Sequence, residues 1–124
     1  MTRFLTIIIS LFGSFSLFAE EIASGTFTGK SDHVTTGSVT ITKTDDGYAI
    51  VLGKDFRLDG APDPRVGLGK DGYESSTDVG ALRENEGEQS YPLAKSVDPA
   101  EFNEVWIWCR RFNVPFGVAK LASE

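Results

Sequence analysis

The 124-residue chain contains one cysteine, Cys109, and one histidine, His33, and their side chains are the ones with distinctive chemistry. A thiol can act as a redox group or as a thiolate ligand, and an imidazole can pair with a thiolate or bind a metal. Arg110 and Arg111 follow the cysteine directly, and nearby guanidinium charge favours the thiolate. Cys109 is therefore the redox candidate. Cys109 and His33 together are candidate cofactor ligands if the fold brings them close.

Each of these two residues also has a structural interpretation. Free cysteine is among the most buried residue types and often serves as a small apolar core residue. A lone histidine is usually a surface residue or a hydrogen-bonded structural one. The sequence alone leaves both interpretations open.

Motifs that bind cofactors covalently or hold structural metals are missing. There is no Cys-x-x-Cys-His segment, which excludes a covalent c-type haem, and the single methionine is Met1. A structural zinc site needs four Cys or His ligands, and the chain has two such residues. A non-covalent haem could draw only on Cys109, His33 or a tyrosine. The cofactor is thus unknown, no metal site is predicted, and no catalytic constellation identifies an enzyme.

The first nineteen residues have the pattern of a signal peptide. Arg3 is followed by an apolar stretch that ends at Ala19, before Glu20 and Glu21. A membrane-spanning helix needs about 20 apolar residues, more than this stretch provides. We expect cleavage after Ala19 and a periplasmic or secreted protein, with residues 20–124 as a single domain.

The charge of residues 20–124 excludes two classes of partner. Eleven Lys and Arg residues stand against eighteen Asp and Glu residues, because only Arg3 lies in the expected signal peptide. A net charge of −7 with no basic stripe argues against nucleic acid and against anionic membrane surfaces. The expected partner is an unidentified redox protein or another exported protein.

The apolar residues that must position Cys109 recur with the period of two that is typical of strands. A turn at Asp45, Asp46 and Gly47 separates two strand patterns, which predicts a hairpin. Many short strands with Gly and Pro between them predict an all-β fold, an antiparallel sandwich or barrel. Asp98, Pro99 and Glu101 form a capping box, which predicts one short helix ending near Asn103. The predicted strands cover residues 23–28, 39–42, 48–52, 56–58, 65–68, 90–93, 105–109 and 114–121.

The strand that carries Cys109 is apolar on both faces. Val105, Ile107 and Cys109 share one face, and Trp106 and Trp108 share the other. Such a strand lies centrally in its sheet and is covered on both sides. We expect both tryptophans to be buried opposite the cysteine. We expect Cys109 to lie at the edge of the core, partly accessible, with Arg111 on its face.

The segment from Val105 to Ala119, which contains Trp106-Ile107-Trp108-Cys109, is a specific signature. Other pieces accompany it in a fixed order along nearly all of residues 20–124: Gly25-Thr26-Phe27, His33 with Gly37, Asp55-Phe56 with Pro62-Asp63, Gly80-Ala81-Leu82, and Gly87 to Tyr91. Together these segments resemble the DM-thirteen domain family, also described as an electron-transfer DM domain.

The resemblance implies an all-β module that takes part in electron transfer. It implies that Cys109 acts as a bare thiol or holds a prosthetic group such as haem, and it gives His33 no established role. Two residues depart from the family pattern, Pro64 and Gly67, where larger apolar and aromatic residues are common; this could open the surface nearby. The leading hypothesis is an exported redox module centred on Cys109. The alternative is a non-catalytic binding module for another exported protein or a small ligand.

Overall fold

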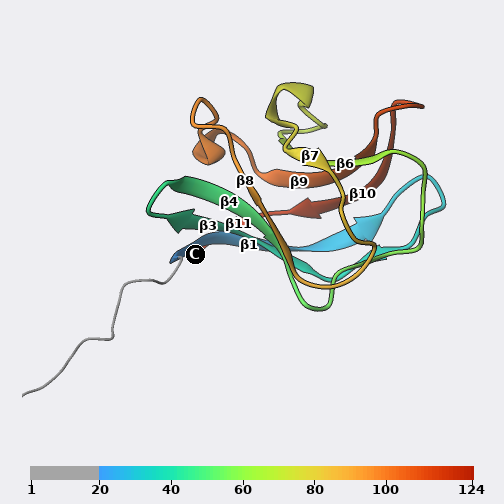
Figure 1. Ribbon diagram of the computed structural model, residues 1–124, viewed down its shortest axis with the longest axis horizontal. Coiled ribbons are helices and arrows are strands. Elements are labelled where there is room, and N and C mark those ends of the chain that lie inside the picture. Colours follow the sequence, from blue (N-terminus) through green and yellow to red (C-terminus); the bar gives the residue numbers. More distant parts are fainter. Residues whose placement is uncertain (1–19) are drawn as a thin grey trace, which may run out of the picture.

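The computed structural model describes residues 20–124, and each segment predicted as a strand overlaps a strand there (Figure 1). The predicted hairpin at Asp45 and Asp46 is confirmed, with Thr44 paired to Gly47 across the turn. The strands are β1 Glu20–Gly29, β2 Thr35–Thr36, β3 Ser38–Thr44, β4 Gly47–Leu52, β5 Arg57–Leu58, β6 Pro64–Gly69, β7 Gly80–Ala81, β8 Gln89–Pro92, β9 Glu104–Cys109, β10 Val114–Lys120 and β11 Ala122–Ser123.

Nine of these strands form one antiparallel sheet in the order β7-β6-β9-β10-β1-β3-β4-β8, with β11 paired to β1. The long strand β1 pairs with β3 along its first part and with β10 at its end. Since β1 pairs with these two strands over different parts of its length, it passes from one half of the sheet to the other, and the sheet curls into a nearly closed barrel (Figure 1). Of the two predicted alternatives, sandwich and barrel, the structure supports the barrel-like form.

The gap between the two edge strands is closed by side chains. The hydroxyl of Tyr91 on β8 accepts a hydrogen bond from Arg83 N, just after β7, at 3.0 Å. The guanidinium of Arg83 donates to Ser90 O at 2.6 Å and lies 4.2 Å from the Tyr91 ring centroid. These contacts bridge the edges without a backbone ladder. The barrel interior is filled by residues such as Val39, Ile50 and Leu68, all fully buried.

The predicted short helix is wrong in type. Pro99–Glu101 forms a lone 3-10 turn, labelled η2, and the only other helical element of residues 20–124 is the 3-10 turn η1, Ser75–Thr77. The capping signal itself is real, because Asp98 accepts from Ala100 N at 3.0 Å. However, Asn103 N already donates to Gly69 O, so the chain joins the sheet before an α-helical turn can form.

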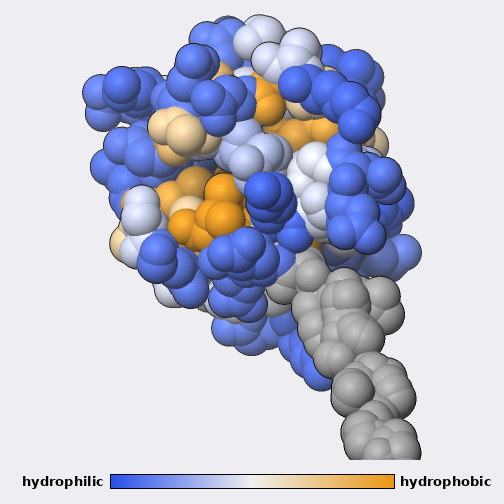
Figure 2. Space-filling model, turned by 90° about the vertical axis from the view of Figure 1, so that its left-hand side faces the viewer, coloured by the Kyte–Doolittle hydropathy of each residue, from blue (hydrophilic) through white to orange (hydrophobic). Residues whose placement is uncertain are grey.

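The two ends of the barrel differ. The β9–β10 turn, the loop of residues 30–34 and the loop of residues 59–63 gather at one end, on the right in Figure 1. The opposite end carries η2 and the β3–β4 turn, and apolar side chains show there between polar ones (Figure 2). A hollow of about 210 Å³ at that end is lined by Ile22, Phe102 and Leu121, among others. Cys109 belongs to the first end.

The expected signal peptide, residues 1–19, lies outside the described residues. Among residues 20–124, no helix has the length and apolar character needed to cross a membrane.

Candidate functional site

Cys109 is the last residue of β9 and points into the barrel. It shares the inner face with Val105 and Ile107, as the alternation predicted, and all three side chains are fully buried. The expectation that Cys109 is partly accessible is therefore wrong. The reason is that the chain turns back over the sulfur directly after the strand.

Residues 110–113 form the turn that covers the thiol. The backbone N–H of Phe112 donates a hydrogen bond to Cys109 Sγ at 3.3 Å. Arg110 ties the turn to the neighbouring loop, because its N–H donates to Asp63 O at 3.2 Å and its Nε lies 3.4 Å from Asp63 Oδ2. Arg111 does not continue the strand face as predicted. Its guanidinium lies 5.8 Å from the exposed Phe112 ring centroid instead.

The turn that follows Cys109 makes few buried contacts. Cys109 lies opposite Pro64 on β6 in a pair that exchanges no backbone hydrogen bonds, and the nearest bond between the two segments runs from Arg110 N to Asp63 O. On β10 its partner is Val114, the first residue after the turn, whose side chain is exposed. All four turn residues are exposed as well. Few buried contacts would be lost if this turn opened, and segments of that kind open locally more readily than the core.

His33 lies at the same end of the barrel but does not pair with Cys109. Its Nδ1 donates to Asp59 Oδ1 at 2.9 Å, and its ring packs edge-on against Phe116, with centroids 4.5 Å apart. Asp59 also accepts from Val34 N. That backbone bond, followed by the His33 bond, holds the pKa of Asp59 below its ordinary value. His33 thus fits the structural interpretation of a hydrogen-bonded residue that ties two loops together.

A haem ligated by Cys109 does not fit this arrangement. The sulfur is fully buried, and its hydrogen bond comes from the backbone of the covering turn. Four surface hollows of about 210 to 420 Å³ occur in the described part of the chain, and neither Cys109 nor His33 lines any of them. Residues 20–124 also contain no cluster of three or more His, Cys, Asp or Glu side chains that could hold a metal.

The outer face of β9 carries the two tryptophans, opposite Cys109 as predicted. Trp106 is 9 % exposed, and its Nε1 donates to Glu104 Oε1 at 2.9 Å. Glu104 is itself 3 % exposed and also accepts from Gly72 N at 3.0 Å. Trp108 is only half-buried, and its Nε1 donates to Asn113 Oδ1 at 3.2 Å. The prediction of burial is confirmed for Trp106 and holds only in part for Trp108.

Tyr73 is the residue of this face that the sequence analysis missed. Its ring stacks on Trp108, with centroids 4.8 Å apart and an interplanar angle of 11°. The ring occupies the space above Gly67 on β6, where an added Cβ would lie 2.7 Å from Tyr73 Cε1. The missing side chain at Gly67 therefore does not open the surface, since Tyr73 fills the place. The glycine at position 67, where the strand lacks a side chain, was the sequence signal that a ring from elsewhere in the chain packs there.

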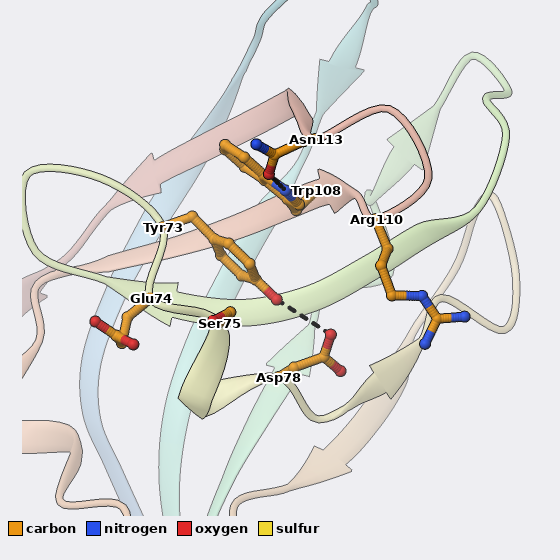
Figure 3. Close-up of a pocket in the computed structure, with 7 residues that line it drawn as sticks. All are labelled: Tyr73, Glu74, Ser75, Asp78, Trp108, Arg110 and Asn113. Atoms are coloured by element: carbon orange, nitrogen blue, oxygen red, sulfur yellow. Dashed lines mark hydrogen bonds between the residues drawn. The ribbon is translucent and has the colours of Figure 1, made fainter.

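Tyr73 is also hydrogen-bonded to a carboxylate. Its hydroxyl donates to Asp78 Oδ2 at 3.1 Å (Figure 3). Burial is the main reason why the pKa of Tyr73 is raised, and the negative charge of Asp78 adds to the effect. Burial alone would raise the pKa of Asp78. Hydrogen bonds from Arg65 and from Gly80 N outweigh it, and the pKa lies below its ordinary value.

A hollow of about 420 Å³ opens beside these rings. Figure 3 shows Tyr73 and Trp108 on one side of it, Asp78 below, and Arg110 reaching in from the turn that covers Cys109. The covering turn thus has two surfaces. Phe112 N faces the buried sulfur, and Arg110 and Asn113 border the aromatic hollow.

Gly37 and Asp55-Phe56, two segments that contribute to the family resemblance, are in contact with each other in the barrel. Gly37 has a φ of +100°, and an added Cβ would lie 2.5 Å from Phe56 Cα. Asp55 accepts from both N and Oγ of Ser38, at 2.9 and 2.8 Å. The close backbone packing at Gly37 and the two hydrogen bonds to Asp55 therefore hold these two segments together.

Most of the chain matches one known protein family. Residues 26–121 match the family described as Electron transfer DM13. Curated proteins and solved structures give no match. The matched range covers most of the chain, from β1 to the residue after β10. The chain therefore belongs to the Electron transfer DM13 family, and its barrel is an electron-transfer-related domain.

Proposed function

We propose that the protein is an exported electron-transfer module whose redox group is the bare thiol of Cys109. The observation that carries the proposal is the way the thiol is covered. One turn of exposed residues lies over the sulfur, and a single N–H···S hydrogen bond joins the two. A local opening of residues 110–113 would expose Cys109 while the rest of the barrel stays folded.

Once the turn has opened, the exposed thiol can enter exchange chemistry. The thiol first loses its proton to solvent, because the thiolate is the nucleophile. The thiolate then attacks one sulfur of a partner disulfide. The partner's S–S bond breaks, a new S–S bond joins Cys109 to one half, and the other half leaves as a thiolate. Cys109 is thereby oxidised, and the departing sulfur is reduced.

Incubation of the folded protein with oxidised glutathione tests this chemistry. We expect one mixed disulfide at Cys109, visible in the intact mass, that dithiothreitol reverses. Cys109→Ser is the matched control and should give no adduct. An adduct that forms only after denaturation would overturn the proposal.

The full burial of Cys109 favours a second candidate, a binding module with an inert thiol. Phe112 is 60 % exposed at the tip of the turn, directly after Arg110 and Arg111, on a chain that is otherwise acidic. An exposed apolar side chain next to positive charge suits an exported partner with an acidic surface. If Cys109 gives no adduct in the folded state, this candidate replaces the redox one.

Export is supported by the apolar pattern that ends at Ala19. The intact mass of the protein released from cells tests this part. We expect a chain that begins at Glu20. A chain that still carries Met1 to Ala19 and stays with the membranes would contradict it.

A further inference from the structure

Three aromatic rings form a continuous series on the outer face of β6 and β9. Tyr73 stacks on Trp108 at 4.8 Å, and Trp108 meets Trp106 edge to face at 5.9 Å with an interplanar angle of 81°. The proposed thiol chemistry uses none of these rings. They lie on the opposite face of β9 from Cys109, so they constitute a separate site.

The strand β6 is shaped to receive this series. Its outer face presents Gly67 and Gly69 opposite the tryptophan strand. An added Cβ at Gly67 would lie 2.7 Å from Tyr73, and one at Gly69 would lie 2.5 Å from Trp106 Nε1. Two glycines on the covered face of a strand weaken it unless something packs in their place. Here two rings occupy that space.

Each polar atom of the series has a defined partner. Trp106 Nε1 donates to the buried Glu104, Trp108 Nε1 donates to Asn113, and the Tyr73 hydroxyl donates to Asp78. Tyr73 is the one phenol of the series, and its acceptor Asp78 is a carboxylate that lines the hollow and can take up the phenolic proton.

Asp78 is held firmly in position to accept that proton. Arg65 Nε and a second guanidinium nitrogen each donate to it at 3.0 Å, and Gly80 N donates at 2.7 Å. Its Oδ2 is the atom that faces the Tyr73 hydroxyl. Because the pKa of Tyr73 is raised, the phenol keeps its proton at neutral pH. A phenol that has lost an electron is a strong acid, so it can release its proton even to a carboxylate of low pKa.

We propose that Tyr73 is a one-electron donor, with Asp78 as its proton acceptor and Trp108 and Trp106 as rings that share the oxidation. The acceptor is a metal-centred one-electron oxidant that reaches the hollow beside Tyr73 and Trp108. One electron leaves Tyr73 for the metal, which is reduced. The phenolic O–H bond breaks as an O–H bond forms on Asp78, and a neutral tyrosyl radical remains.

Access to the site supports this role. Tyr73 and Trp108 are half-buried and line the hollow of about 420 Å³, so an oxidant can approach them from solvent (Figure 3). Trp106 lies behind them at 9 % exposure. The series thus runs from the surface into a protected position.

Flash-quench oxidation with ruthenium(III) tris-bipyridine, followed by freezing and electron paramagnetic resonance, tests the proposal. The chain has three tyrosines, so Tyr48→Phe and Tyr91→Phe are matched controls for Tyr73→Phe. We expect a tyrosyl signal that Tyr73→Phe abolishes, with a tryptophan radical in its place, and that both controls retain. Asp78→Asn should reduce the tyrosyl yield in protein whose circular dichroism is unchanged.

A tyrosyl signal that survives Tyr73→Phe, or that either control lowers equally, would overturn the proposal. So would an unchanged tyrosyl yield in a folded Asp78→Asn variant. Because none of these variants alters Cys109, failure here leaves the thiol proposal standing. A glutathione adduct that never forms likewise leaves Tyr73 untouched.

Discussion

The backbone N–H of Phe112 donates its hydrogen bond to Cys109 Sγ over 3.3 Å, so the β9–β10 turn closes directly on the one thiol of the chain. This contact makes the sulfur part of the core while only one turn of exposed residues separates it from solvent. The burial of Cys109 and its proposed reactivity are compatible if this turn opens alone.

Cys109→Ser should fold and lose stability. The hydroxyl can still accept from Phe112 N, but it places a more polar group in an apolar site. A buried polar group with incomplete hydrogen bonding costs about 1–3 kcal/mol of unfolding free energy. Urea unfolding at pH 7 measures the loss. A variant as stable as the wild type would mean that the site is more hydrated than the structure indicates.

Asp63→Asn should speed the labelling of Cys109 by a thiol reagent in the folded protein. The change removes the charge that faces Arg110 Nε at 3.4 Å. The φ of +50° at this position is one that Asn tolerates as well as Asp. An exposed ion pair contributes about 0.2–1 kcal/mol, which corresponds to a labelling rate faster by a factor of about 1.4 to 5.

Asp71→Asn is the matched control for that variant, because Asp71 also has a positive φ, of 58°, but does not contact the turn. Its labelling rate should equal that of the wild type. If both variants changed the rate equally, Asp63 would have no specific part in holding the turn.

The two tryptophans should differ in their contribution to stability. Trp106→Ala removes a buried ring and a donor to Glu104, and such truncations cost about 3–5 kcal/mol. Trp108→Ala should cost less, because its ring is half-exposed. Urea unfolding of both variants makes the comparison. A larger loss for Trp108 would mean that the stack with Tyr73 is the stronger support of this face.

Asp78→Asn should be most destabilising at neutral pH. The folded pKa of Asp78 lies below its ordinary value, so its stabilising effect is full above about pH 5 and declines as the pH falls below about 4. The expected loss at pH 7 is about 1–3 kcal/mol, since hydrogen bonds to a charged group are removed.

Unfolding free energies of the wild type and the variant at pH 7 and pH 3 give the test. The difference between the two proteins should shrink at pH 3. Asp46→Asn, at an exposed turn residue, should show no such change. A difference that stays constant with pH would contradict the assigned role of Asp78.

Much of the fold was predictable because the strands carry a strong period of two. The hairpin at Asp45 and Asp46, the central position of β9 and the opposed faces of Cys109 and Trp106 all follow from that pattern. The 3-10 turn at Pro99 could not be predicted from the sequence. A capping box shows where a helix begins, but it does not show how many residues follow before the chain joins the sheet.

The candidate site was predictable only in part. Cys109 stands out by residue type, but its burial depends on a turn that folds back after the strand, and alternation cannot show this. Tyr73 went unnoticed because it lies in a loop with no strand pattern. Its position depends on the space that Gly67 leaves on β6, and the sequence does not show that the two residues are in contact.

The measurement that bears most directly on the proposed thiol chemistry is the urea dependence of Cys109 labelling in the folded protein. If the 110–113 turn opens alone, the labelling rate rises only weakly with urea, because little surface is exposed in the opening. The account predicts a slope far below that of global unfolding measured by circular dichroism. A slope equal to the global one would mean that Cys109 reacts only when the whole barrel unfolds, and that the thiol is an inert part of the core.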